Sequence, residues 1–478
     1  MKIINHSAVC PWPPLRLLNW ACIATLAMGA SSVWSQTAVN ERNPLRFRDV
    51  TQSDVLALPA VEIGDASAQV SPSNEPALEL TEFIQRALDI SPQLQQVRAQ
   101  LEMAQSGRKI ARADLLPSFS LRHATGPEQS QALQLAQDKH TYRQSTVRLT
   151  QPLYNAPLSH ELAASRQAET SAEFRFQSAY DNVLMSVVRS TVDVASTRLV
   201  LDFSNVQLAQ LQNILNYLET RVSAGAASPA DLERARTRVL NARQIRIEQQ
   251  AAYRNSLLEL SRLTGLTPLA IRLPDASRFP DVAVGSPQLQ TLALAQNPDL
   301  RALQLDIEAQ QSRIKAEMSK YLPVVGVSLE HDNSKNVQGT NGPHTNTRAL
   351  LVATWATSLG GKEWHQAEQA RAELRSREAK LTDESQRLSQ ALEGDMALLQ
   401  SAVLRIQTAQ LEQASAAKVV EAVAEQLKTG RLGSLLDALD ASERFFAARQ
   451  RLVQSMGQNI KAHAQILQRT GQLRAIKP

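Results

Sequence analysis

Apolar residues recur every seven positions along two long stretches of the chain. The first series is Val187, Val194, Leu201, Leu208, Leu215 and Val222. The second, with one polar member, is Leu392, Leu399, Ile406, Gln413, Val420 and Leu427. Proline is absent from 158–228 and from 362–476, so no residue of that type stops a helix there. A sustained heptad buries its seam against neighbouring helices. The pattern predicts coiled-coil helices, the first about 100 Å long over residues 158–222.

Short glycine-containing turns interrupt both long stretches and predict that each helix reverses. Gly225 and Gly430 suit the C-terminus of a helix. Ser228, followed by proline, suits the cap of the returning helix, and Ser434 is its counterpart in the second turn. The sequence thus predicts two long helical hairpins whose tips point the same way.

Ahead of each hairpin, apolar residues take every second place, which is typical of strands. The segments are 119–123, 147–153, 325–329 and 349–355. The stretches around Gly126–Glu128 and Gly342–His344 are predicted to be polar loops that join the strands in pairs. A helix of about 35 residues is expected before each pair, entered through Ser91–Pro92 or Asn297–Pro298.

The order of these elements is duplicated at one constant offset. Ala87 and Ala293 begin similar segments 206 positions apart (293 minus 87), and Leu116–Pro117 and Leu322–Pro323 keep the same spacing. The repeat predicts two structural copies. The expected boundaries are a signal peptide at 1–35, an extended or poorly ordered arm at 36–77, the first repeat at 78–270, a linker at 271–285, the second repeat at 286–470 and a tail at 471–478.

Composition narrows the location and the chemistry. Lys2 and Arg16 precede an apolar run that is typical of an export signal. The only two cysteines, Cys10 and Cys22, lie in that segment, so a mature chain would hold no disulfide framework or cysteine-ligated metal. The net charge of +5 is spread among interleaved acids and bases, which argues against nucleic-acid binding. No nucleotide, hydrolase or zinc-protease motif occurs, so neither an enzyme nor a cofactor or metal site is expected.

Four strands per chain cannot close into a barrel, because bacterial membrane barrels need about eight or more. Three chains would pool about twelve strands. The predicted fold is mainly α with a small β part: strands pooled from several chains would form a β-barrel in an outer membrane, which the helical hairpins would continue as an α-helical tube. The alternative is a periplasmic coiled-coil adaptor or scaffold protein without a barrel.

In the order and duplication of these motifs, residues 78–470 resemble the TolC-like outer-membrane factor family. The match rests on the helix starts at Ser91 and Asn297, the Leu-Pro junctions, the strand exit at Thr150–Tyr154 and both turns. The resemblance implies a homotrimeric passive conduit in the outer membrane, used in type I protein secretion or in multidrug or metal efflux. It also implies partners: a periplasmic adaptor and an inner-membrane ABC or proton-driven transporter.

The resemblance also implies sites at the turns. Asp437 and Asp440, three positions apart on one helix face, match the acidic rings that close the periplasmic aperture of the family. Both also suit the first turn of a helix, where acids favour the dipole. Asp231 matches a position that links neighbouring helices, with Arg431 as its expected partner. Gly225, Ser228, Gly430 and Ser434 are the expected adaptor contacts, or else purely structural turn residues.

Overall fold

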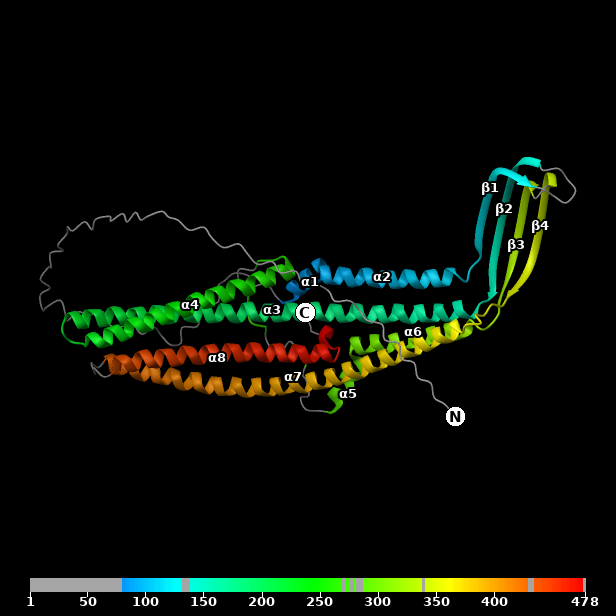
Figure 1. Ribbon diagram of the computed structural model, residues 1–478. Helices are drawn as coiled ribbons and strands as arrows, with labels where there is room; N and C mark the ends of the chain where they lie inside the picture. The colour runs from blue at the N-terminus through cyan, green and yellow to red at the C-terminus, as the bar shows by residue number, and fades with distance from the viewer. Residues whose placement is uncertain are drawn as a thin grey trace, which may run out of the picture. The chain divides into compact units, whose positions relative to one another are not determined.

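The computed structural model describes residues 80–130, 138–267, 271–274, 279–280, 287–337, 340–428 and 434–475. Helices make up most of these residues, and four strands form one sheet (Figure 1). The expected signal peptide and N-terminal arm lie outside the described residues, as does most of the expected linker. None of the described helices has an apolar stretch long enough for a membrane span.

The same order of elements occurs twice. The first copy comprises α1 (Leu80–Ile90), α2 (Pro92–Ala113), β1 (Ser118–Ser130), β2 (Asp138–Tyr154), α3 (Ala156–Ser223) and α4 (Pro229–Thr264). The second comprises α5 (Pro287–Gln296), α6 (Pro298–Ser319), β3 (Val324–Val337), β4 (Thr340–Thr354), α7 (Lys362–Lys428) and α8 (Ser434–Arg469). A short 3₁₀ helix, η3, follows at Leu473–Ala475. Two helices, two strands and a long helical hairpin therefore form the repeating unit.

The long helices agree with the prediction from the heptads and the missing prolines. α3 has 68 residues and α7 has 67. Val187 and Val194 of α3 are fully buried, and Leu392 and Leu399 of α7 are nearly so. The seam thus faces other helices, and the long helices are stabilised by packing along their length.

The helices before the strands are shorter than predicted. α2 and α6 have 22 residues each, not about 35. Ser91 caps α2, since its hydroxyl accepts a hydrogen bond from the Leu94 amide at 3.3 Å. Asn297 caps α6 in the same way, accepting from the Leu300 amide at 3.2 Å. A cap residue has extended backbone, so the residues before it form the separate helices α1 and α5.

The four strands pair in the order β1-β2-β3-β4, all antiparallel. They are longer than predicted, and the placement of Gly126–Glu128 and Gly342–His344 in loops is wrong. These residues lie within β1 and β4. Both segments contain a proline, and β1 and β4 are the edge strands, where proline is tolerated because its nitrogen can face away from the neighbouring strand.

The two faces of the sheet differ in chemistry. One face, called the apolar face, carries Phe119, Leu121, Val147, Leu149, Val325, Val327, Leu329 and Leu351. The opposite, polar face carries Ser120, Arg148, Glu330 and Arg348, which follow one another across the four strands. Leu121 and Leu351 are 65% and 72% exposed, so the apolar face is uncovered by described parts of this chain.

The largest core cluster gathers residues of both copies. Phe83 of α1, Val187 of α3 and Leu260 of α4 pack there with Leu467 of α8 and Leu473 of η3, and all five are essentially inaccessible. The helical hairpins are therefore held together around α3 and α8.

Candidate functional site

The first hairpin turn is a well-defined helix stop and start. Gly225 has φ +70°, and the Ala226 amide donates to the Arg221 carbonyl oxygen at 2.8 Å. This is a Schellman-type end, which favours glycine because side chains disfavour positive φ. Ser228 then caps α4, its hydroxyl accepting from the Ala230 amide at 3.2 Å. Both residues thus have a structural role, and they stand at the exposed turn expected to contact an adaptor.

The second turn is described only from its returning helix. Gly430 and Arg431 lie outside the described residues, and Ser434 is the first residue of α8. Asp437 lies in the first turn of α8 and is exposed. It forms no ion pair with another described residue.

An ion-pair cluster joins the two hairpins just behind the turns. Arg238 of α4 contacts the Asp440 carboxylate at 2.6 Å and also the Glu443 carboxylate. Burial works to lower the pKa of Arg238, but the hydrogen bonds and charges of Glu443 and Asp440 raise it above its ordinary value. The guanidinium therefore keeps its charge between the two acids. Asp440 is only half exposed, whereas Asp437 is not covered.

Asp231 has a partner on its own helix. Its carboxylate is 3.3 Å from the Arg234 guanidinium, one turn further along α4. The expected pairing of Asp231 with Arg431 stays a prediction, because Arg431 is not among the described residues.

A small apolar core lies next to this cluster. Leu439 of α8 is completely buried among Leu211 of α3 and Ala235 and Val239 of α4. Since Leu439 directly precedes Asp440, this packing fixes the face that the acid presents to Arg238. The first turns of α8 are thereby fastened to the first hairpin.

Further along α8, a cation stacks on aromatic rings. The Arg449 guanidinium lies 4.0 Å from the centre of the Phe203 ring of α3 and 5.5 Å from that of Phe445. Burial lowers the pKa of Arg449 from its ordinary value. Such cation–π contacts are worth about 0.5–2 kcal/mol. The contact between Arg449 and Phe203 therefore also stabilises the packing of the second copy on the first.

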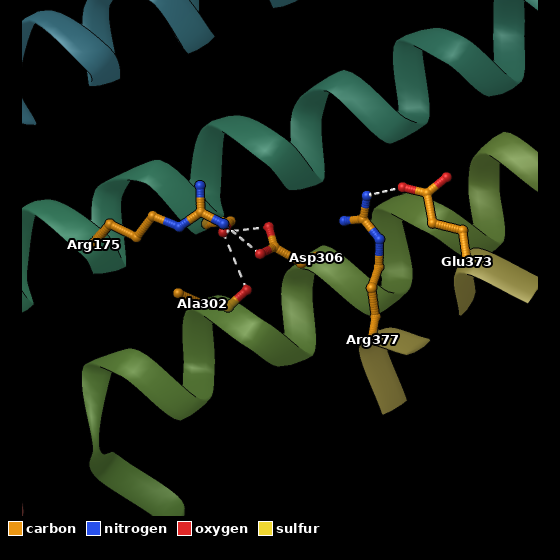
Figure 2. Close-up of polar contacts among 6 residues, drawn as sticks. Arg175, Ala302, Asp306, Glu373 and Arg377 are labelled. Carbon is orange, nitrogen blue, oxygen red and sulfur yellow. Dashed lines mark hydrogen bonds and ion pairs between the residues drawn. The ribbon is translucent and has the colours of Figure 1, made fainter. Parts of the chain in front are cut away.

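Nearer the sheet, charged residues again connect the copies. Figure 2 shows Arg175 of α3 and Asp306 of α6 extending toward one another, and they form an ion pair. The hydroxyl of Ser171 donates to the same carboxylate at 2.7 Å and makes a 3.1 Å contact with the Ala302 carbonyl oxygen. In the same view, Arg377 of α7 donates to its helix neighbour Glu373 (Figure 2). Hydrogen bonding from Arg377 holds the pKa of Glu373 below its ordinary value.

The 3₁₀ helix η3 is anchored by a deeply placed carboxylate. Arg474 of η3 donates twice to Asp181 of α3, at 2.7 and 2.9 Å, and the Asp181 side chain is 3% exposed. Hydrogen bonding to Asp181 raises the pKa of Arg474. Beside this pair lies a polar cavity of about 300 Å³ lined by residues of α3, α6, α7 and α8.

The polar face of the sheet carries its own charge ladder. Glu330 of β3 lies between Arg148 of β2, at 3.4 Å, and Arg348 of β4, at 3.3 Å. The three residues are direct cross-strand neighbours. Opposite charges in that register stabilise strand pairing by about 0.2–1 kcal/mol.

Several of these contacts could not be found from the sequence. Nothing in the chain marks Arg238 or Glu443, because neither belongs to a motif and their pairing depends on how α8 packs on α4. Arg449 is likewise an ordinary helical arginine until α8 packs beside Phe203. Among the described residues, no group of His, Asp or Glu is placed to hold a metal ion.

Comparison with known proteins places both copies in one family. The model of the family described as outer membrane efflux protein matches residues 83–266 and 289–472. The two matched segments cover both repeats and most of the chain.

Individual proteins agree with this match. The chain is 25% identical over 364 residues to protein CyaE of Bordetella pertussis, covering 74% of this chain and 76% of CyaE. It is 26% identical over 275 residues to the alkaline protease secretion protein AprF of Pseudomonas aeruginosa, covering 54% and 56%. The solved Campylobacter jejuni CmeC outer membrane channel has the same fold, with a TM-score of 0.71 at 14% identity over 82% of this chain and 86% of CmeC.

Proposed function

Because the chain belongs to the outer membrane efflux protein family, we propose that three copies form one passive conduit through the outer membrane. Members of the family are non-enzymatic outer-membrane channel components of tripartite efflux or secretion machines, and so is this chain. The trimer, the closed barrel and the roles of single residues are our proposal.

The single observation that supports the proposed trimer is the chemistry of the sheet, at its edges and on its two faces. Its edge strands, β1 and β4, each lack a partner on one side among the described residues. Its apolar face is exposed, and its polar face carries the Arg148–Glu330–Arg348 ladder. Pairing β1 of one copy with β4 of the next satisfies both edges and gives a barrel of about twelve strands with a polar interior. The apolar face then contacts lipid.

The helical hairpins continue the conduit on the periplasmic side and close it at their turns. Asp437, exposed at the start of α8, presents one carboxylate per copy to the aperture, so a trimer has a ring of three. Asp440 contributes its charge mainly to Arg238, which holds the second hairpin against the first. Asp231 and Arg431 form a further link between helices in the closed state. A ring of acids favours cations and repels itself, so opening relieves the repulsion.

The turns are the docking surface for the partner proteins. Gly225, Ser228, Gly430 and Ser434 contact a periplasmic adaptor, and an inner-membrane ABC or proton-driven transporter supplies cargo and energy. Secretion of a polypeptide is supported by the name of AprF, and small-molecule efflux by the description of the family. An export assay in a strain that lacks the gene, with a secreted protein and a panel of toxic compounds, separates these two.

Two measurements test the conduit. Light scattering in mild detergent should give a trimer, and the purified protein should form conducting channels in planar bilayers. A monomer without conductance would overturn the proposal. The alternative, a periplasmic coiled-coil scaffold, requires that the mature protein be released by osmotic shock without detergent; the strands, with their exposed apolar face, disfavour it.

A further inference from the structure

Two like charges face one another on the two central strands of the sheet. Arg143 of β2 and Lys335 of β3 are direct cross-strand partners in the antiparallel register. Both are exposed, and neither forms an ion pair or a side-chain hydrogen bond with a described residue. Like charges directly opposite one another destabilise strand pairing. Their coexistence therefore calls for an anion that lies outside this sheet.

The register places this pair on the apolar face. Side chains alternate along a strand, so Arg143 shares its face with Val147 and Leu149, and Lys335 shares its face with Val327 and Leu329. The pair lies beyond the last apolar row, toward the strand ends that are remote from the helices.

The height of the pair fits the boundary of a membrane. Lys335 follows Val325 by ten residues, about 34 Å of strand. At the usual barrel tilt of about 40°, this becomes about 26 Å along the membrane normal, close to the height of about 25 Å of the lipid-facing band in outer-membrane barrels. The apolar side chains themselves end at the row of Val147, four residues before the pair, and a polar row with Ser145 and Asn333 lies between. The two cations therefore stand where the lipid headgroups begin.

The described acids of the strands are confined to one face of the sheet. Among the strand side chains that the structure describes, the acids Glu128, Glu330 and Asp332 take the polar face. The apolar face carries Lys139, Arg143 and Lys335 and no described acid. The cations at the rim of the apolar face thus lack a described counter-charge on that face.

We propose that Arg143 and Lys335 together bind the phosphate of an anionic lipid headgroup in the outer leaflet. The inference rests on the proposed function, because the apolar face meets lipid only if the barrel forms. A guanidinium offers a planar fork of donors for phosphate oxygens, and a lysine adds a compact charge. One phosphate between the two groups removes their repulsion and fixes a lipid at the seam of β2 and β3.

The test compares lipid retention by the full-length trimer. Wild type, the double variant R143Q/K335Q and the control Arg122→Gln are placed in nanodiscs of phosphatidylcholine with a minor share of phosphatidylglycerol, and bound lipid is counted by native mass spectrometry. Arg122 lies on the polar face of β1, so its loss should leave the lipid unchanged. We expect several-fold enrichment of phosphatidylglycerol in wild type and in the control, and no enrichment in the double variant.

A charge reversal guards against misfolding. Lys335→Glu places an acid opposite Arg143, so the sheet gains an internal ion pair while the lipid preference should vanish. The inference is overturned if wild type and Lys335→Glu retain equal amounts of phosphatidylglycerol. It is also overturned if inorganic phosphate stabilises these two proteins equally in detergent solution. Bilayer conductance is measured on the same samples. Conducting channels without a lipid preference would contradict only this inference, whereas the absence of channels would contradict the proposed function.

Discussion

Arg238 of α4 and Asp440 of α8 approach to 2.6 Å, so a base from the first copy neutralises an acid of the second beside the hairpin turns. The same guanidinium also binds Glu443. The two candidate aperture acids therefore differ: Asp440 forms an ion pair with Arg238, whereas Asp437 forms none with a described residue.

Replacing Arg238 with glutamine should loosen the closed turns. Asp440 and Glu443 would lose their shared partner, and their charges would then repel acids of neighbouring helices. The stability cost should be below about 1 kcal/mol, because the acids are half exposed. We expect higher single-channel conductance and stronger cation preference. The control is Arg236→Gln, since Arg236 pairs with Glu219 and Glu233 inside the first hairpin; equal conductance in both variants would refute a latch role for Arg238.

Asp437→Asn should reduce cation preference without opening the closed state. Its carboxylate has no ion pair with a described residue, so its removal subtracts charge from the proposed aperture and breaks no described ion pair between the hairpins. The double variant D437A/D440A should show both a change in selectivity and a change in conductance. Reversal potentials in asymmetric salt provide the measurement. If selectivity is unaltered in both variants, these acids do not line the constriction.

Gly225→Ala should destabilise the first turn. At φ +70° an alanine costs about 1–2 kcal/mol, although nothing within 4 Å would clash with its added carbon. Hydrogen exchange of the amides around 220–230 should accelerate, and affinity for the adaptor should fall. Gly394→Ala, in the exposed middle of α7 with ordinary backbone, should instead slow exchange locally. If Gly225→Ala and Gly394→Ala change local hydrogen exchange in a similar way, the backbone of Gly225 is not constrained.

Acid should weaken the contact between Glu373 and Arg377. Hydrogen bonding lowers the pKa of Glu373 from 4.5, so the folded state binds its proton less readily than the unfolded state does. The stabilisation is therefore present above the unfolded value and is lost as pH falls through the lower folded value. Unfolding midpoints of wild type and Glu373→Gln should differ at about pH 7 and converge once the pH has fallen below the folded pKa of Glu373. Glu378→Gln is the control, because Glu378 forms no ion pair with a described residue; a gap for Glu373→Gln that is independent of pH would contradict the assignment.

Arg474→Met should be the most destabilising of these changes. It leaves the Asp181 carboxylate buried without its partner, and breaking a buried pair costs about 3–5 kcal/mol. Because Arg474 itself is partly exposed, we expect about 3 kcal/mol, seen as a lower unfolding midpoint. Adding Asp181→Asn should recover part of the loss, since the amide needs no counter-charge. No recovery in the double variant would show that Arg474 acts through packing alone.

The sequence predicted the helices better than the strands, and for physical reasons. Heptads and missing prolines mark α3 and α7 directly. β1 and β4 were predicted too short, because Pro127 and Pro343 are typical of turns and are tolerated here only at sheet edges. The duplicated caps at Ser91 and Asn297 were recognisable as helix starts, but the separate helices ahead of them were not predicted.

At the candidate site, the turns could be predicted from local motifs. The other contacts depend on packing between helices that are distant in the sequence, so they could not be predicted. Gly225 and Ser228 lie in a glycine and proline pattern that is typical of one helix ending and the next beginning. The Arg238 cluster depends instead on Leu439 packing between α3 and α4, which no spacing along the chain encodes.

The positions of Pro127 and Pro343 bear on how neighbouring copies are joined. Each lies in an edge strand toward the end remote from the helices, and neither has a backbone N–H to donate. In the proposed assembly the hydrogen bonds between neighbouring copies are therefore strongest close to the helices. They open first at the outer rim, where the strand pairs of each copy can move independently. Detachment of one protomer would begin at the cell surface.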